Sequence, residues 1–264
     1  MAIRAKEMSK MLQQERFDSI MEMLKNNSAV KVSDLSNILK VSESTVRRDI
    51  TDLAEAGKLK KVFGGAVSVK TSDIIGKEYD MRAKSDVNIE EKRRIAEYAA
   101  SIINDNDFVF IDAGTTTGMM VDYLKNTNVT YVTNGYTHAL KMAAKGLRTY
   151  VISGQMKSVT EAVVGAGAVE SIKKYNFTKC FIGTNGIDTE EGFTTPDIEE
   201  SMVKSEAINR SYMTFMLADH SKFGIVAPVT IAPLSSGCII TDRIDDVRYK
   251  DYTVVKAVDE EEEK

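Results

Sequence analysis

The sequence predicts a two-domain α/β protein, with an N-terminal winged helix-turn-helix followed by a mostly parallel α/β domain. Three observations predict it. Residues 16–66 hold amphipathic helical stretches and a basic alternating run, and residues 89–258 alternate apolar strands with helices. Such strands indicate a parallel sheet covered on both faces. The charge also differs between the two parts, and 264 residues suffice for two domains.

The segment Val41–Asp49 opens a predicted DNA-recognition helix. Ser42 is a good N-cap, because its hydroxyl can accept a hydrogen bond from a free amide of the first turn. Val46, Ile50 and Leu53 recur at helical spacing and form a narrow apolar stripe. The opposite face carries side chains suited to phosphates and base edges in a major groove, namely Ser44, Arg47, Arg48 and Thr51.

Two predicted helices precede this segment. The first, amphipathic, is expected from Arg16 to Leu24. The second is short, with Ser33 as its expected cap and with inward residues Leu35, Ile38 and Leu39. Lys40 and Val41 then form a tight turn into the recognition helix, which completes the order of a helix-turn-helix.

A basic wing is expected after the recognition helix. Gly57 should end that helix, and the alternating run Leu59–Val62 predicts one strand of the wing. The lysines expected along the DNA backbone are Lys58, Lys60 and Lys61. The alternative is a basic helical hairpin with a solvated face; the capped helix, the paired arginines and the wing together favour DNA binding.

The charge distribution supports a nucleic-acid reader joined to a different domain. Residues 1–70 hold 13 Lys and Arg against 9 Asp and Glu, a net charge of +4, and the remainder holds 22 against 30, a net charge of −8. No apolar run approaches the length of a membrane span, and Met1–Lys10 lacks the apolar core of a signal peptide. We therefore expect a cytoplasmic protein. Cys180 and Cys238 are expected to be buried thiols, the alternative being a disulfide, and no Cys/His cluster has zinc spacing.

The domain boundaries follow from composition. We expect a DNA-binding domain over 1–66, a polar linker over 67–88, an effector domain over 89–258 and a disordered acidic tail over 259–264. Helices are expected at Glu90–Ile103, after the threonine-rich loop as far as Leu124, and at about Tyr136–Ala144. Strands are expected at Phe108–Ile111, Val129–Thr133, Thr149–Ile152, Cys180–Ile182, Phe215–Ala218, Cys238–Ile240 and Thr253–Val255. Parallel sheets bind ligands at the carboxyl ends of their strands, which directs attention to four loops.

The loop Asp112–Thr117 directly follows a strand and opens a helix. Gly114 lets the backbone approach an anion, and successive amides and threonine hydroxyls can then donate to it at the positive end of the helix dipole. No Gly-Lys-Ser/Thr follows, so this is not a Walker loop. The pattern favours a phosphate site over an ordinary strand-helix turn.

Three further strand ends carry polar residues. Asn134 can adopt a left-handed turn, the safer interpretation, or bind a sugar hydroxyl. The loops Gly183–Asp188 and Asp219–Gly224 follow later strands. In the last loop Lys222 offers a cation for a phosphate, and Asp219 can accept hydrogen bonds from sugar hydroxyls. The alternative for Lys222 is a solvated surface lysine.

Two other features are assigned no role in ligand binding. Gly165–Ala168 imitates a dinucleotide fingerprint but lacks the third glycine and a clear preceding strand. His138 lies inside a predicted helix, where a hydrogen-bonded structural or surface histidine is expected rather than a catalytic one.

Five separated motifs occur in order: Val41–Asp49, Phe63–Ala66, Asp112–Thr117, Val132–Asn134 and Ala218–Gly224. Together they make the chain resemble the DeoR family of bacterial transcriptional regulators, over Arg16–Val258. The resemblance implies a winged helix-turn-helix and a C-terminal effector domain that binds phosphorylated sugars. That domain looks like ribose-5-phosphate isomerase and the CoA-transferase folds.

One stretch narrows the resemblance. Gly183–Asp197 is similar to the fructose operon repressors of the family, which implies fructose 1-phosphate as effector. Repressors for tagatose and galactitol phosphates look related here. The family usually shows Gly-Gly after the third strand, where this chain has Ser153-Gly154-Gln155. Gln155 is therefore expected to narrow the pocket or to add a hydroxyl contact.

These features combine into a hypothesis of a repressor of a sugar-uptake operon, released from double-stranded DNA by a sugar phosphate. The DNA contacts would come from Ser42, Ser44, Thr45, Arg47, Arg48, Thr51, Lys58, Lys60 and Lys61. The phosphate would lie against Gly114, Thr115, Thr116 and Lys222. The rest of the site would comprise Asp112, Asn134, Gly154, Gly183, Asn185, Gly186 and Asp219. A homodimer or homotetramer would place paired heads on repeated half-sites.

The rival hypothesis is an enzyme, a sugar-phosphate isomerase with an accessory head. Four carboxylates could serve as bases: Asp112, Asp188, Glu199 and Glu200. An isomerase has no need of arginines facing outward from a recognition helix, so we expect no enzyme and no cofactor. A third alternative is an activator that needs the sugar, because the residues do not distinguish the sign of the response.

Overall fold

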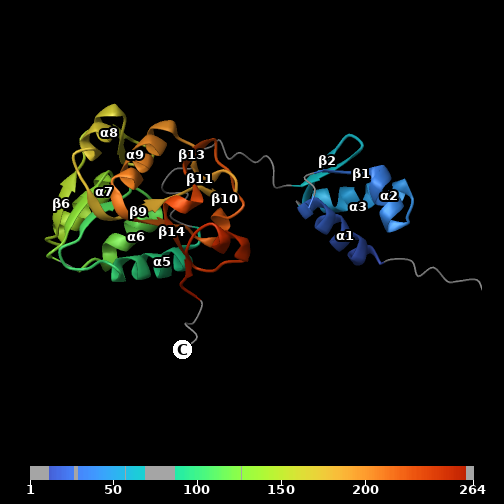
Figure 1. Ribbon diagram of the computed structural model, residues 1–264, viewed down its shortest axis with the longest axis horizontal. Helices are drawn as coiled ribbons and strands as arrows, with labels where there is room; N and C mark the ends of the chain where they lie inside the picture. Colours follow the sequence, from blue (N-terminus) through green and yellow to red (C-terminus); the bar gives the residue numbers. More distant parts are fainter. Residues whose placement is uncertain (1–11, 27–28, 57, 69–86, 126, 260–264) are drawn as a thin grey trace, which may run out of the picture. The chain divides into compact units, whose positions relative to one another are not determined.

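The computed structural model describes residues 12–26, 29–56, 58–68, 87–125 and 127–259. The chain divides into two compact units, Met1–Asp73 and Ile74–Lys264, which we call the head and the sensor unit (Figure 1). The head has its own hydrophobic core, and the sensor unit has a core on each face of its main sheet.

The head packs three helices against a small sheet. The helices are α1 (Gln13–Asn26), α2 (Val32–Leu39) and α3 (Glu43–Glu55). The antiparallel sheet has the order β1 (Ala29–Lys31), β3 (Gly65–Ser68), β2 (Leu59–Val62). The helical stripes meet in a core that includes Ile20, Leu24, Leu35, Val46, Ile50 and Leu53. The predicted winged helix-turn-helix is confirmed.

A buried ion pair joins α1 to α3. Arg16 donates from Nε to Asp49 Oδ2 at 2.6 Å and from a terminal nitrogen to Oδ1 at 2.8 Å. Both residues are at most 8% exposed. The hydrogen bond with Asp49 raises the pKa of Arg16, against the effect of burial. This two-point pairing fixes the orientation of the recognition helix on the helix that supports it.

Details of the head differ from the sequence prediction. Ser33 does not cap α2: the cap position is Lys31, because β1 leads directly into the helix and the Val32 N–H donates to the Gly64 carbonyl at 2.9 Å. Ile38 is 60% exposed, since the stripe that enters the core runs through Val32, Leu35 and Leu39. Strand β1 was not predicted.

The head also extends beyond its predicted end. Strand β3 continues through Ser68, two residues into the predicted linker, because Val67 and Ser68 pair with neighbouring strands. Helix α3 is followed by Ala56 as C-cap. The predicted helix stop at Gly57 lies outside the described residues, as does the linker over 69–86.

The sensor unit is built on a seven-stranded sheet whose strands are all parallel. Its order is β15 (Val255–Ala257), β14 (Cys238–Thr241), β12 (Ser211–Leu217), β9 (Phe177–Gly183), β4 (Phe108–Ile111), β5 (Thr130–Thr133) and β6 (Arg148–Val151). The four loops singled out in the sequence therefore follow four adjacent central strands: β12, β9, β4 and β5. Adjacent parallel strands bring their carboxyl ends to one edge of the sheet.

Helices cover both faces of this sheet (Figure 1). On one face α5 (Ile89–Ser101), α6 (Thr115–Tyr123) and α7 (Tyr136–Ala144) contribute to a core with Val109, Phe181 and Leu217. On the other, α8 (Ala166–Ile172) and α9 (Ile198–Asn209) contribute to a core with Phe110, Ile182 and Met216. Alternate residues of one strand enter opposite cores, as a sheet buried on both faces requires.

Smaller elements surround the main sheet. Strands β7 (Gln155–Lys157) and β8 (Ala162–Val164) form an antiparallel pair, and β10 (Gly186–Asp188), β11 (Gly192–Thr195) and β13 (Val229–Ala232) form a second antiparallel sheet. Short 3-10 turns occur at His220–Lys222, Leu234–Ser236 and Val247–Asp251.

Three predictions in this unit need correction. Strand β8 directly precedes Gly165, so that glycine does follow a strand, although the strand belongs to an antiparallel pair. The last strand begins at Val255, not Thr253. Asp259 is not part of a disordered tail, because its carboxylate pairs with Arg94 at 2.6 Å; residues 260–264 lie outside the described part.

Candidate functional site

The recognition helix α3 begins as predicted. Ser42 is its N-cap, and the Ser42 hydroxyl accepts a hydrogen bond from the Thr45 N–H at 3.3 Å. That hydroxyl also lies 2.8 Å from the Ser44 hydroxyl and 2.9 Å from the Thr45 hydroxyl. Three hydroxyls thus gather at the N-terminus of α3, where the helix dipole favours an anion such as a phosphate.

Cations continue along the same helix and onto the wing. Arg47 and Arg48 are exposed, and Arg47 contacts Glu43 one turn earlier at 2.7 Å. Lys61, on β2, donates to the Thr51 hydroxyl at 2.9 Å, which connects the wing to α3. The remaining wing lysines, Lys58 and Lys60, are exposed. The nine side chains predicted to contact DNA thus come from α3 and its N-cap and from β2 and the residue before it.

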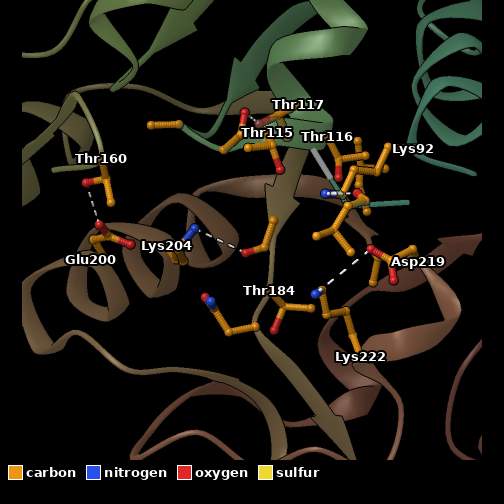
Figure 2. Close-up of a pocket in the computed structure, with 17 residues that line it drawn as sticks. Lys92, Thr115, Thr116, Thr117, Thr160, Thr184, Glu200, Lys204, Asp219 and Lys222 are labelled. Carbon is orange, nitrogen blue, oxygen red and sulfur yellow. Dashed lines mark hydrogen bonds and ion pairs between the residues drawn. The ribbon is translucent and has the colours of Figure 1, made fainter. Parts of the chain in front are cut away.

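A cavity of about 370 Å³ opens at the carboxyl ends of β4, β9 and β12 in the sensor unit. Its volume is in the range of small-molecule sites. Figure 2 shows Lys204 and Glu200 on one side, Lys222 and Asp219 on the other, and the first threonines of α6 above them. The side chains and backbone that line it come from Val87, Lys92, Ala113–Thr117, Thr160, Gly183–Asn185, Glu200, Lys204, Leu217–Asp219 and Lys222.

One wall of this cavity is the N-terminus of α6. Gly114 holds the N-cap position in extended conformation and has no side chain to cap the helix, so the free amides of the first turn are left for another acceptor. Thr115 and Thr116 line the cavity beside them. Amides at the positive end of a helix dipole, accompanied by hydroxyls, are suited to a phosphate. We call this wall the threonine cradle.

Charged side chains complete the cavity. Lys204 donates to the Asp112 carboxylate and, at 3.1 Å, to the Gly183 carbonyl. Burial raises the pKa of the Asp112 carboxyl, while the Lys204 ammonium and the Gly183 N–H act in the opposite direction. On the other side, Asp219 is 1% exposed and lies 4.0 Å from the Lys222 ammonium.

Asp219 is held as a carboxylate. Burial by itself would raise the pKa of Asp219, but the Lys222 charge and the hydrogen bonds from Ser221 and Asn88 bring that pKa below its ordinary value. The cavity thus pairs cations near a helix N-terminus with carboxylates that can accept from hydroxyls.

Comparison with known proteins places both units. Residues 16–72 match the DeoR-like helix-turn-helix domain, and residues 87–243 match the DeoR C terminal sensor domain. The chain belongs to the DeoR family of transcriptional regulators. It is 40% identical to the "Uncharacterized HTH-type transcriptional regulator FruR" of Bacillus subtilis (strain 168), over 94% of this chain and 99% of that protein.

The chain is also similar to a relative with lower identity. The lactose phosphotransferase system repressor of Staphylococcus aureus (strain NCTC 8325 / PS 47) is 33% identical over 80% of this chain and 84% of its own. Among solved structures, ribose 5-phosphate isomerase A of Methanocaldococcus jannaschii matches 52% of this chain and 55% of its own, with 11% identity and a TM-score of 0.38. That likeness is too distant to bear on function.

The structure brings most of the predicted effector-binding residues into the cavity. Those that line it are Gly114, Thr115, Thr116, Gly183, Asn185, Asp219 and Lys222. Four others, Asp112, Asn134, Gly154 and Gly186, are not among its lining residues. Gln155, expected to narrow the pocket, does not line it either.

Each of the four makes a structural contact in the sensor unit. Asn134 Oδ1 accepts from the Ala113 N–H at 2.7 Å, and Asp112 accepts from the Gly183 N–H at 3.0 Å, so both hold the loops beside the cavity. The two glycines allow close packing. A Cβ atom at position 154 would lie only 2.7 Å from the Val164 carbonyl oxygen, and a Cβ atom at position 186 would lie only 2.3 Å from the Ile225 carbonyl oxygen.

Sequence reasoning missed several residues of the cavity: Val87, Lys92, Thr160, Thr184 and Lys204, with Glu200 considered only as a base. A signal was present for three of them. Lys92 lies in line with Ile95 and Ala99 on the buried face of α5, and Glu200 and Lys204 lie on the buried face of α9. A charged residue within an apolar helical stripe indicates a buried polar site.

His138 supports the threonine cradle from behind. It is 4% exposed in α7, and its Nε2 lies 3.1 Å from the Gly114 carbonyl oxygen. Burial lowers its pKa to about 4. A neutral ring whose Nε2 carries the proton donates to that carbonyl and fixes the loop, a structural role as expected.

The described residues offer neither a membrane-spanning helix nor a metal-binding cluster. Within 12–26, 29–56, 58–68, 87–125 and 127–259, no helix combines the length and apolar content needed to cross a bilayer. In the same ranges, His, Cys, Asp and Glu side chains nowhere gather in threes to hold a metal ion. Cys180 and Cys238 are free thiols, the first buried and the second half-buried.

Proposed function

We propose that this regulator represses a sugar-utilisation operon and is released from its operator by a sugar phosphate bound in the sensor cavity. One observation carries the proposal. The cavity combines a helix N-terminus, threonine hydroxyls and lysine ammonium groups with buried carboxylates. The first group of features suits a phosphate, and the carboxylates suit sugar hydroxyls.

In this proposal the two ends of the ligand contact different walls. The phosphate lies on Gly114, Thr115 and Thr116, with Lys222 as counter-charge. The hydroxyls face Asn185 and Asp219. Fructose 1-phosphate is the favoured effector, supported by the identity to FruR of Bacillus subtilis. Tagatose and galactitol phosphates are the alternative effectors.

The DNA-binding part of the proposal rests on the exposed face of α3 and the wing. Arg47 and Arg48 read base edges, the hydroxyls at the start of α3 contact phosphate, and the wing lysines follow the backbone. A homodimer or homotetramer presents two heads to paired half-sites, since helix-turn-helix proteins bind symmetric operators in this way. Arg48→Ala should weaken operator binding by about 1–3 kcal/mol if Arg48 contacts a base.

An isomerase is the competing function, because Glu200 is a carboxylate in the cavity. Its Oε1 accepts from the Thr160 hydroxyl at 2.8 Å and from Lys157 at 3.4 Å. These donors occupy that oxygen and hold the side chain in place, which favours a role in ligand binding over proton abstraction. Robust turnover of fructose 1-phosphate or ribose 5-phosphate would overturn the repressor proposal.

The decisive experiment is fluorescence anisotropy with the promoter DNA upstream of the chain's own gene, at fixed salt, titrated with fructose 1-phosphate. We expect tight binding that the sugar weakens by roughly 5- to 150-fold, the usual range of allosteric coupling. If the affinity for DNA does not change with fructose 1-phosphate but changes with tagatose or galactitol phosphate, the effector is that other sugar phosphate. Binding that the sugar strengthens would make the protein an activator.

A further inference from the structure

The residue that begins α5 breaks a local rule. Asn88 holds the N-cap position, where an asparagine side chain ordinarily accepts from a backbone N–H of the first turn. It makes no such bond, and its backbone is left-handed, with φ 53° and ψ 46°. Its side-chain amide instead donates to Asp219 Oδ1 at 2.9 Å, across 131 residues of sequence. Departures of this kind are concentrated at functional sites.

A second contact joins the same turn to the cavity. Lys92 is 3% exposed, and its ammonium donates to the Val87 carbonyl at 2.7 Å. Lys92 and Val87 both line the cavity, and Figure 2 shows Lys92 beside Thr116. The carbonyl of Asn88 accepts from the Lys92 N–H at 3.0 Å. Residues 87–92 are thus bound to the cavity through two polar side chains.

This turn lies at the start of the described part of the sensor unit. The head ends its last strand at Ser68, and Val87 is the first described residue of the sensor unit. Of the described residues of the sensor unit, those of this turn are therefore nearest to the head along the sequence, and this position suits them to act on the head.

We propose that Asn88 and Lys92 couple the cavity to the head: Lys92 binds the anionic group of the ligand, and the Asn88–Asp219 hydrogen bond transmits occupancy to the start of α5. The inference rests on the proposed function and names its regulatory connection. An ammonium has three donors, so Lys92 can hold the Val87 carbonyl and a phosphate oxygen together. A bound phosphate also attracts the Lys222 ammonium. This weakens the electrostatic attraction between Lys222 and Asp219, and Asp219 is the residue that accepts the hydrogen bond from Asn88.

Glycine at position 88 tests the coupling without disturbing the backbone. Asn88→Gly keeps the left-handed conformation at no steric cost and removes only the amide. Asn128→Ala is the matched control, because Asn128 also donates to an aspartate, Asp105, at 3.4 Å, but lies outside the cavity lining. For each variant we would measure operator affinity by anisotropy without and with saturating fructose 1-phosphate, at one salt concentration.

The measured quantity is the ratio of the two operator affinities. We expect Asn88→Gly to reduce the wild-type ratio by about fivefold or more, and Asn128→Ala to leave it unchanged. By reciprocity, DNA should change the affinity for the sugar by the same reduced factor in Asn88→Gly. A wild-type ratio in Asn88→Gly overturns this inference alone. A wild-type protein with no response to any sugar phosphate overturns the proposed function and the inference with it.

Lysine 92 has a test of its own. Lys92→Met keeps an unbranched side chain and removes the ammonium; Lys145→Met is the control, because Lys145 likewise donates to backbone carbonyls, those of Val121 and Asp122, outside the cavity lining. Calorimetric titration with fructose 1-phosphate should show about tenfold weaker binding or more for Lys92→Met and no change for Lys145→Met. An unchanged affinity of Lys92→Met for fructose 1-phosphate would mean that Lys92 does not contact the ligand.

Discussion

The head and the sensor unit present their functional side chains in opposite ways. In the head, Arg48 and Lys60 stand in solvent on a regular helix and strand. In the sensor unit, Lys204 and Asp219 are buried and bound to other protein groups. Removal of Arg48 or Lys60 should therefore affect DNA binding with little loss of stability, whereas removal of Lys204 or Asp219 should impair ligand binding and folding together.

The largest expected effect is in the sensor unit. Lys204→Ala leaves the buried Asp112 carboxylate without its counter-ion, which should lower the free energy of unfolding by about 3–5 kcal/mol. Urea denaturation followed by circular dichroism measures it. Lys173→Ala is the control, because its ion pair with Glu170 is exposed and should contribute little to the free energy of unfolding. Equal losses in the two variants would contradict the contrast between buried and exposed charges.

The next effect is a pH dependence from His138. Burial holds the pKa of His138 at about 4 in the folded protein, against 6.5 in the unfolded chain. Between these values the unfolded chain binds the proton and the folded protein does not. The stability from the neutral ring is therefore complete above pH 6.5 and is lost as pH falls toward 4, by about 3 kcal/mol in total.

Variant His138→Gln isolates this contribution. We expect the fall in unfolding free energy between pH 7.5 and pH 4.5 to be smaller in the variant than in the wild type by about 2–3 kcal/mol. Because each protein is compared with itself at the two pH values, a loss of packing that lowers the unfolding free energy equally at both pH values does not affect the result. Parallel pH profiles would mean that His138 is not the group that titrates.

The same contrast explains what the sequence could predict. The head was predicted almost completely, because α3 repeats its apolar stripe at helical spacing and has a serine at its start, both of which act locally. The parallel sheet followed from near-continuous apolar strands. The errors in the head arose where a tertiary contact replaced a local one: the Gly64 carbonyl, not Ser33, satisfies the start of α2.

The cavity was predicted in part. Thr115, Asn185 and Lys222 come from loops after neighbouring strands, so the rule on strand ends located them. Lys92 and Lys204 lie within helices, and only the folded arrangement brings their ammonium groups to the strand ends. The rule also cannot distinguish a loop residue that faces a ligand from one that holds its neighbour, which is why Asn134 was predicted both as a turn residue and as a ligand contact.

Asn134 and Asn185 sharpen that distinction. Asn134→Ala removes the acceptor of the buried Ala113 N–H and should cost roughly 1–3 kcal/mol of stability. Asn185→Ala loses only a 3.2 Å contact from the Thr195 hydroxyl and should retain stability while it weakens sugar binding. Thermal unfolding and calorimetric titration of fructose 1-phosphate on both variants give the answer. A loss of stability in Asn185→Ala but not in Asn134→Ala would mean that Asn185 is the structural residue and that Asn134 is not.

The smallest effect belongs to the wing. Lys60 is exposed, so Lys60→Ala should leave folding and sugar affinity unchanged. If Lys60 contacts one phosphate, the plot of log affinity for DNA against log salt concentration should lose about 0.9 of its slope, equally for operator and unrelated DNA. Lys141→Ala is the control, an exposed lysine of the sensor unit 3.7 Å from Asp122. An unchanged slope would place the wing away from the DNA backbone and leave α3 as the described element that contacts DNA. A loss of operator binding alone would instead make Lys60 a reader of base sequence, which a flexible exposed cation on the wing is not expected to be.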